Sequence, residues 1–116
     1  MTLREELALI PELESTGVGM VEHAQSLFPS AVATKKGQRW VFDPNFATFT
    51  VQHARARSIA VSVRGNPEEF QHHPELEIKR DQAGYSIFRV QSALQLGAAK
   101  RYLDRAAELY KRGRRR

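Results

Sequence analysis

The sequence contains no cysteine, and this absence alone removes several kinds of chemistry. Disulfide bonds, thiolate zinc sites and a cysteine nucleophile are all excluded, and a chain without thiols suits a reducing compartment. Long apolar runs are missing as well, because no stretch approaches the roughly 20 apolar residues that span a membrane. The opening segment, MTLREELALIPELE, carries acidic side chains where a secretory signal needs basic ones. We therefore expect a cytoplasmic protein with no membrane partner.

Motifs for a nucleotide cofactor or for catalysis are also lacking. Gly17 and Gly19 do not follow a predicted strand, and no further glycine completes a phosphate-binding loop. His23 and His53 have no sequence neighbour that would orient either ring as a base, and no Ser-His-Asp arrangement can be named. We therefore expect no cofactor, no catalytic residue and no enzymatic activity.

The segment FQHHPELE holds the one cluster of residue types that bind metals. The cluster consists of His72, His73, Glu75 and Glu77. Adjacent histidines on an extended chain point to opposite sides, so both could hardly serve one ion without a turn. We expect a polar surface loop without a metal site, and an enzyme with a small pocket at His72 or His73 is only the third choice of function. Glu68 and Glu69 are expected to begin a helical turn, where acidic residues are favoured.

Hydrophobic periodicity, in contrast, is well developed and predicts both helices and strands. Helical spacing and a capping box of Thr2 and Glu5 predict a helix within residues 2–14. Pro11 and the glycines at 17 and 19 interrupt this pattern, which resumes over residues 21–28. A second capping box, Ser92 with Gln95, opens a helix predicted to end near Lys111. Alternation with a period of two predicts strands at residues 31–35, 39–43, 46–53, 58–64, 76–79 and 85–90.

This order of elements predicts an α+β two-layer sandwich. An N-terminal helix or helices, an antiparallel meander of five or six strands and a C-terminal helix should form one domain, with the helices on one face of the sheet. Residues 1–111 are assigned to this domain and residues 112–116 to a flexible basic tail. The aromatic residues at alternating strand positions are expected in the core, not on a base-stacking platform. They are Trp40, Phe42, Phe49 and Phe88.

Positive charge is distributed unevenly along the chain. The net charge is +5, and eight of the 18 Lys and Arg residues follow Ala99, together with only two acidic residues. Such a segment favours a polyanion, nucleic acid before an acidic protein. Arg55 and Arg57 lie two residues apart, and on a strand they would share a face that could continue this positive surface. The predicted function is therefore a non-catalytic nucleic-acid binding module, for DNA more than RNA. The predicted contacts are Arg55, Arg57, Lys100, Arg101, Arg105, Lys111, Arg112, Arg114, Arg115 and Arg116.

Two other interpretations of the same residues stay open. The basic side chains could be ordinary surface charges paired with the acidic first helices, because Lys and Arg are mostly exposed in any protein. The chain could also be a protein-interaction or homodimerisation module without nucleic-acid binding. In that case a sheet edge, or the sheet face not covered by helices, would pair with a second copy.

Residues 20–111 resemble a small bacterial domain of unknown function. The resemblance rests on an aromatic strand at Trp40 to Phe42, a strand from Asn45 to Thr50, an aliphatic strand from Ile59 to Val63, and a final helix with Ala106 to Tyr110 near its end. That domain closes proteins described as predicted transport proteins and occurs beside restriction-type nuclease domains; YjbR-like proteins are similar to it. The resemblance implies the fold and an association with DNA handling, supplies no catalytic residue, and does not extend to the inserted residues 64–70.

Overall fold

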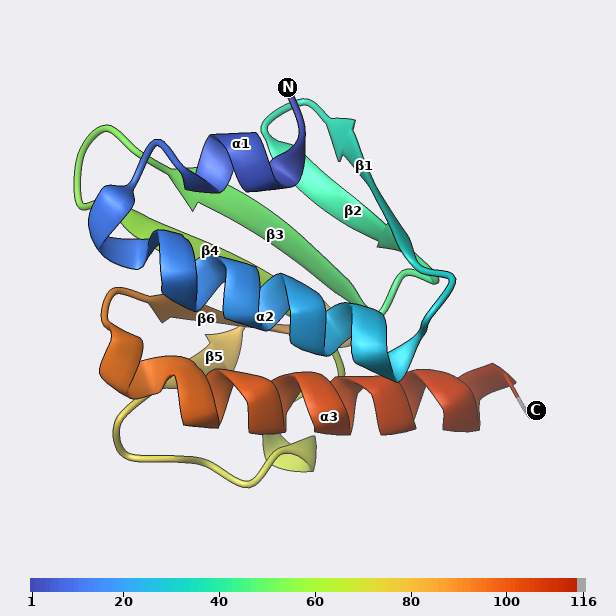
Figure 1. Ribbon diagram of the computed structural model, residues 1–116. Helices are drawn as coiled ribbons and strands as arrows, with labels where there is room; N and C mark the ends of the chain where they lie inside the picture. Colours follow the sequence, from blue (N-terminus) through green and yellow to red (C-terminus); the bar gives the residue numbers. More distant parts are fainter. Residues whose placement is uncertain (115–116) are drawn as a thin grey trace.

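The protein folds into two layers, a six-stranded antiparallel sheet and a layer of helices on one of its faces (Figure 1). The computed structural model describes residues 1–114. The helices are α1 (Leu3–Leu7), α2 (Glu14–Leu27) and α3 (Leu96–Arg114). Short 3₁₀ turns lie at Pro11–Leu13, Pro67–Glu69 and Ala93–Gln95. The predicted α+β two-layer class is confirmed.

The sheet follows a meander through four strands and then departs from it. The strands are β1 (Val32–Lys36), β2 (Arg39–Asp43), β3 (Ala47–Gln52), β4 (Ser58–Arg64), β5 (Ile78–Arg80) and β6 (Tyr85–Val90). Their order in the sheet is β1-β2-β3-β4-β6-β5, so β6 lies beside β4 and β5 forms the edge. The two last strands exchange the positions that a meander would give them, for a physical reason. Strand β6 pairs with β4 along six residues, whereas β5 has only three residues. Short strands are suited to the edge of a sheet.

The core lies between the helices and one face of the sheet. All four aromatic residues predicted there are buried, and Phe46 joins them. Leu7 and Met20 contribute from α1 and α2, and α3 contributes a stripe that includes Tyr102 and Leu103. Because α3 packs on α2, β4 and β6 together, it closes the core over the centre of the sheet.

Helix α2 begins earlier than the sequence pattern indicates. We expected the glycines at 17 and 19 to break the helix, but both lie inside it. A Cβ atom on Gly17 would lie 2.6 Å from a methyl group of Leu7 and 2.9 Å from one of Ile59. Glycine is therefore used here for the close approach of α2 to α1 and to the sheet, which outweighs its weak helix propensity.

Candidate nucleic-acid interface

The structure separates the predicted basic residues into groups, and the first group lies between β3 and β4. Arg55 and Arg57 belong to the connection of residues 53–57, so the prediction that they share a strand face is wrong. Ala56 between them has a positive φ of 43°, which turns the backbone away from an extended path. The geometry of the hairpin connection therefore sets the direction of these two side chains. The alternation of side chains along a strand does not apply to them.

Arg57 is engaged by the N-terminal segment of the same chain. Its guanidinium donates to the carbonyl oxygen of Leu9 at 2.9 Å, and its Nε lies 3.5 Å from a carboxylate oxygen of Glu12. This is the pairing with acidic residues that the alternative interpretation describes. Part of the positive charge of the connection is therefore neutralised inside the protein.

Arg55 borders a hollow of about 500 Å³ between α1 and the end of β3, where its side chain is exposed. The buried carboxylate of Glu6 faces this hollow and accepts hydrogen bonds from Lys35 at 3.2 Å and from the indole of Trp40 at 3.3 Å. At this end of the sheet, basic side chains are therefore paired with acidic ones, as in Lys35 with Glu6 and Arg57 with Glu12.

The last basic residues lie at the opposite end of the sheet from this connection. Strand β4 begins at Ser58, directly after Arg57, and ends at Arg64, whose guanidinium carbon lies 5.2 Å from the centre of the Tyr110 ring on α3. Seven strand residues span about 20 Å. Figure 1 shows the β3–β4 connection and the C-terminal end of α3 at opposite ends of the molecule. A single continuous stripe through Arg55 and the end of α3 is therefore not formed.

A groove runs along the side of α3 that faces the β4–β5 connection. Arg101, Arg105 and Arg112 lie on this side of the helix, separated by about 6 and 10 Å along its axis. They border two hollows of about 350 and 360 Å³ that adjoin at Arg105. We call these two hollows together the α3 groove. Arginines from successive turns of one helix are thus brought to one concave surface.

The other predicted residues of α3 lie apart from the groove or beyond the described chain. Lys100 and Lys111 are eleven residues apart and share the side of the helix that faces α2. The Lys111 ammonium lies 5.2 Å from the centre of the Phe28 ring, a cation–π contact. Arg114 is the last residue of α3, so the helix continues past Lys111. Arg115 and Arg116 lie outside the described residues.

Arg64 is not among the predicted contacts, but the structure places it in the groove. Its guanidinium carbon lies over the rings of Tyr85 and Tyr110, at 5.7 and 5.2 Å from their centres. Its Nε is buried without a hydrogen-bond partner, and no carboxylate of residues 1–114 lies within ion-pair distance of it. Counting basic residues could not distinguish it from the other arginines, because its environment depends on α3 and β6, which are distant in sequence.

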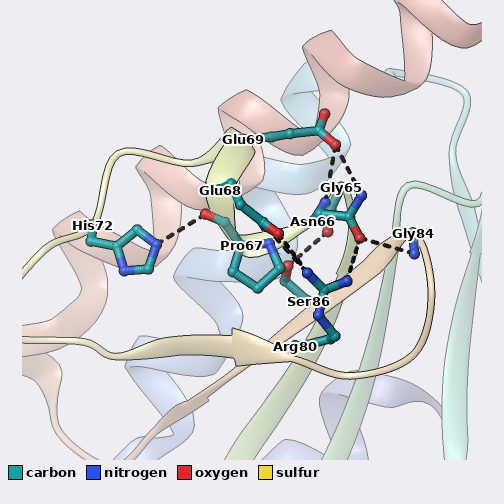
Figure 2. A network of polar contacts seen from close by, with 9 residues as sticks. All are labelled: Gly65, Asn66, Pro67, Glu68, Glu69, His72, Arg80, Gly84 and Ser86. Atoms are coloured by element: carbon teal, nitrogen blue, oxygen red, sulfur yellow. Dashed lines mark hydrogen bonds and ion pairs between the residues drawn. The ribbon is translucent and has the colours of Figure 1, made fainter.

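The wall opposite α3 is held by a network around Asn66 (Figure 2). The side-chain oxygen of Asn66 accepts from Arg80 at 2.9 Å and from the backbone of Gly84 at 3.1 Å. The carboxylate of Glu69 accepts from the backbone and side chain of Asn66, both at 3.3 Å, and Glu68 pairs with Arg80. Both glutamates belong to the 3₁₀ turn predicted for them and are used to fix it. The network therefore ties the inserted loop to the β5–β6 turn.

Tyr102 attaches the next part of this wall to α3. Its buried hydroxyl donates to the carbonyl oxygen of Leu76 at 2.6 Å and accepts from the backbone of His73 at 3.0 Å. Burial raises the pKa of Tyr102 because the phenolate would lose its hydration there. His72 contacts the carbonyl oxygen of Pro67 at 2.9 Å. Within residues 1–114 no group of three or more metal-binding side chains comes together, at this loop or elsewhere.

Comparison with protein-family models, with curated proteins and with solved structures finds no match to this chain. The resemblance described above therefore stays a prediction. None of the helices in the described part of the chain is both long and apolar enough to cross a membrane.

Proposed function

We propose that the protein is a non-catalytic binding module for nucleic acid, DNA before RNA, and that the α3 groove is its binding surface. The observation that carries the proposal is the convergence of Arg64, Arg105 and Arg112, from β4 and from α3, on one hollow. A concave surface lined by guanidinium groups suits a phosphate backbone, because each neutralised phosphate releases condensed counterions. The proposed location is the cytoplasm, where nucleic acid is accessible.

The charges along the groove favour an anion. Its acidic lining residues are Glu69, Asp104 and Glu108. Asp104 is paired with His23 at 2.7 Å, and the hydrogen bonds that Glu69 accepts from Asn66 leave its negative charge in place. Glu108 lies 3.9 Å from Arg105, at the limit of an ion pair on an exposed surface. Within the described residues the groove is therefore lined by four arginines, Arg64, Arg101, Arg105 and Arg112, and three acidic residues, an excess of one positive charge.

The proposed surface differs from the one that charge counting predicted. It excludes Arg55 and Arg57, which lie at the far end of β4, and it adds Arg64. Lys111 lies at the same end of α3 and can contribute long-range attraction from the α2 side. The interface is thus smaller, and its contacts come from one helix and the end of one strand.

The test compares two double variants that change the net charge equally. Binding of labelled single- and double-stranded DNA and RNA is measured by fluorescence anisotropy over a salt series. We expect the Arg105→Gln, Arg112→Gln variant to bind weakly and to lose roughly two units from the slope of log affinity against log salt. The control, Arg55→Gln with Arg57→Gln, should bind as the unchanged protein does. Equal losses in both variants, or no binding at low salt, would contradict the proposal.

One observation favours the alternative of a homodimerisation module. The face of the sheet opposite the helices is uncovered, and Val41, Tyr85 and Ile87 on it are only half-buried. The sheet edges are less suited to pairing, because β1 carries Lys35 and Lys36 while the short β5 carries Lys79 and Arg80. Light scattering of the purified protein distinguishes the two functions: a stable dimer without DNA affinity supports this alternative.

A further inference from the structure

We propose that the hollow formed by Arg64, Arg105 and Arg112 is a pocket for a phosphomonoester, and that its ligand is the terminal phosphate of a nucleic-acid strand. This inference rests on the proposed function, because it assigns one end of the α3 groove to one end of the strand. It goes further, since a surface for backbone phosphates alone has no preference between a phosphorylated and an unphosphorylated end.

The charge of the pocket matches a terminal phosphate better than an internal one. Among residues 1–114, three guanidinium groups and the carboxylate of Glu69 line it, an excess of two positive charges, and Glu108 lies 3.9 Å from Arg105 beside the pocket. A phosphomonoester carries nearly two negative charges at pH 7 and three strong acceptor oxygens, whereas a phosphodiester carries one charge. The volume of about 360 Å³ admits a phosphate group together with part of its sugar.

Two of the three arginines are held in place before any ligand binds. The Arg64 guanidinium lies over the rings of Tyr85 and Tyr110, and these two cation–π contacts restrict its movement. Arg105 donates from Nε to the carbonyl oxygen of Glu69 at 2.8 Å, and its Nη1 lies 3.9 Å from a carboxylate oxygen of Glu108, so Nη2 is the terminal nitrogen left for a ligand. Binding to groups that are already ordered loses less side-chain entropy, and charge-assisted bonds to phosphate are strong.

The floor of the pocket requires the glycine that follows Arg64. Gly65 has a φ of +121°, a conformation that favours glycine. A Cβ atom there would lie 2.5 Å from a methyl group of Leu109 and 2.9 Å from the Phe70 ring. The backbone therefore approaches α3 closely enough for Arg64 on β4 and Arg112 on the last turns of α3 to border the same space.

The backbone of α3 does not favour an anion in this pocket. The carbonyl groups at a helix C-terminus carry a partial negative charge, which repels phosphate. The two nearby backbone amides are already used, since Gly65 donates to Gly84 at 2.8 Å and Gly84 donates to Asn66 at 3.1 Å. Binding must then depend on the arginine side chains, so that their replacement should remove it completely.

The experiment compares one single-stranded DNA oligonucleotide in three forms: with a 5′-phosphate, with a 3′-phosphate and with hydroxyl groups at both ends. We expect one phosphorylated form to bind about tenfold more tightly than the form without phosphate. Arg64→Gln and, separately, the surface change Arg112→Gln should abolish this preference. Arg101→Gln is the matched control: Arg101 borders only the other hollow, so its loss should weaken binding of all three oligonucleotides equally and leave the preference for the phosphorylated end unchanged.

The outcomes separate this inference from the function on which it rests. Equal binding of all three oligonucleotides overturns the terminal-phosphate pocket and leaves the groove as a backbone-binding surface. Absence of binding to every oligonucleotide overturns the proposed function as well. A 5′-mononucleotide or inorganic phosphate that competes as well as the phosphorylated oligonucleotide overturns the strand end as ligand. Circular dichroism of each variant at the assay temperature confirms that a loss of preference is not a loss of fold.

Discussion

The two basic regions of this protein look alike in sequence and differ in structure. In the β3–β4 connection, Arg57 is bonded to the N-terminal segment. In the α3 groove, Arg105 lies 3.9 Å from Glu108, whereas Arg64 and Arg112, like Arg55 in the connection, have no carboxylate partner within residues 1–114. The number of arginines is therefore a poor guide to a binding surface. What matters is whether the fold supplies partners for them from its own chain.

The largest effect is expected from closing the space beside the groove. Gly65→Ala introduces a side chain at a φ that only glycine adopts easily and against Leu109 and Phe70. Strain and overpacking together should lower the free energy of unfolding by roughly 4 kcal/mol, measured by urea denaturation. Gly97→Ala is the control: this exposed glycine of α3 has open space around it, so the stability should stay or rise slightly. Similar values for both variants would show that the close approach at Gly65 is not needed.

A smaller effect is expected from detaching the opposite wall of the groove. Tyr102→Phe removes a buried hydroxyl and leaves the backbone groups of His73 and Leu76 without their partner. The free energy of unfolding should fall by about 1–3 kcal/mol in chemical denaturation at pH 7.

The same tyrosine gives a pH dependence with a definite sign. Because burial raises its pKa above the ordinary value of 10.0, the folded state holds this proton more tightly than the unfolded state. Its contribution is complete below pH 10 and is lost as the pH rises through the folded pKa. The Tyr102→Phe variant should show a weaker loss of stability above pH 10 than the unchanged protein. Identical alkaline profiles would contradict this assignment.

The other basic region should respond much less. Arg57→Gln removes one hydrogen bond to Leu9 and an ion pair with Glu12, both on the surface. Such contacts contribute little in water, so the free energy of unfolding should change by less than about 1 kcal/mol. The affinity for oligonucleotides should not change. A clear loss of affinity in this variant alone would restore the β3–β4 connection as part of the interface.

The smallest effect is expected at the start of the chain. Hydrogen bonds from the backbone amide of Thr2 and from its hydroxyl lower the pKa of Glu5 below 4.5. The folded state therefore favours the charged carboxylate, and this contribution is present above pH 4.5 and lost as the pH falls through the folded pKa. Glu5→Gln should slightly lower the thermal midpoint at pH 7, and the difference should shrink as the pH falls below 4.5.

Local patterns predicted the fold class well because they act over a few residues. The alternation around Phe49 and Phe88 requires only that each strand has one buried face, and the Thr2–Glu5 capping box forms within a single turn. The position of β6 between β4 and β5 could not be found in this way. It depends on how much surface two distant strands bury together, which no short window contains.

The candidate site was less predictable than the fold for the same reason. The groove residues Arg101, Arg105 and Arg112 could be named from the charge of the last helix. Helical spacing also predicts that they lie on one side of the helix. The opposite wall of the groove, in contrast, comes from a loop about 30 residues earlier in the sequence. Arg64 was not selected because the two tyrosines that hold it are far away in sequence. Gly17 was expected to interrupt the helix, but it lies inside α2, and close packing against Leu7 and Ile59 explains why the residue is glycine.

The pairing of β4 with β6 also determines the order in which the molecule can fold. The two strands meet only after residues 65–84 have closed into a loop, whereas β1 to β4 pair with their immediate neighbours. Closing this loop costs chain entropy before any strand contact offsets it, so the β4–β6 junction should form late. During synthesis on the ribosome, one edge of β4 stays open until β6 has emerged, and the apolar face under α3 stays open until α3 has emerged. A nascent chain of this protein therefore exposes an unpaired strand edge and an apolar sheet face for several seconds. A chaperone that binds apolar segments would prevent aggregation during this interval.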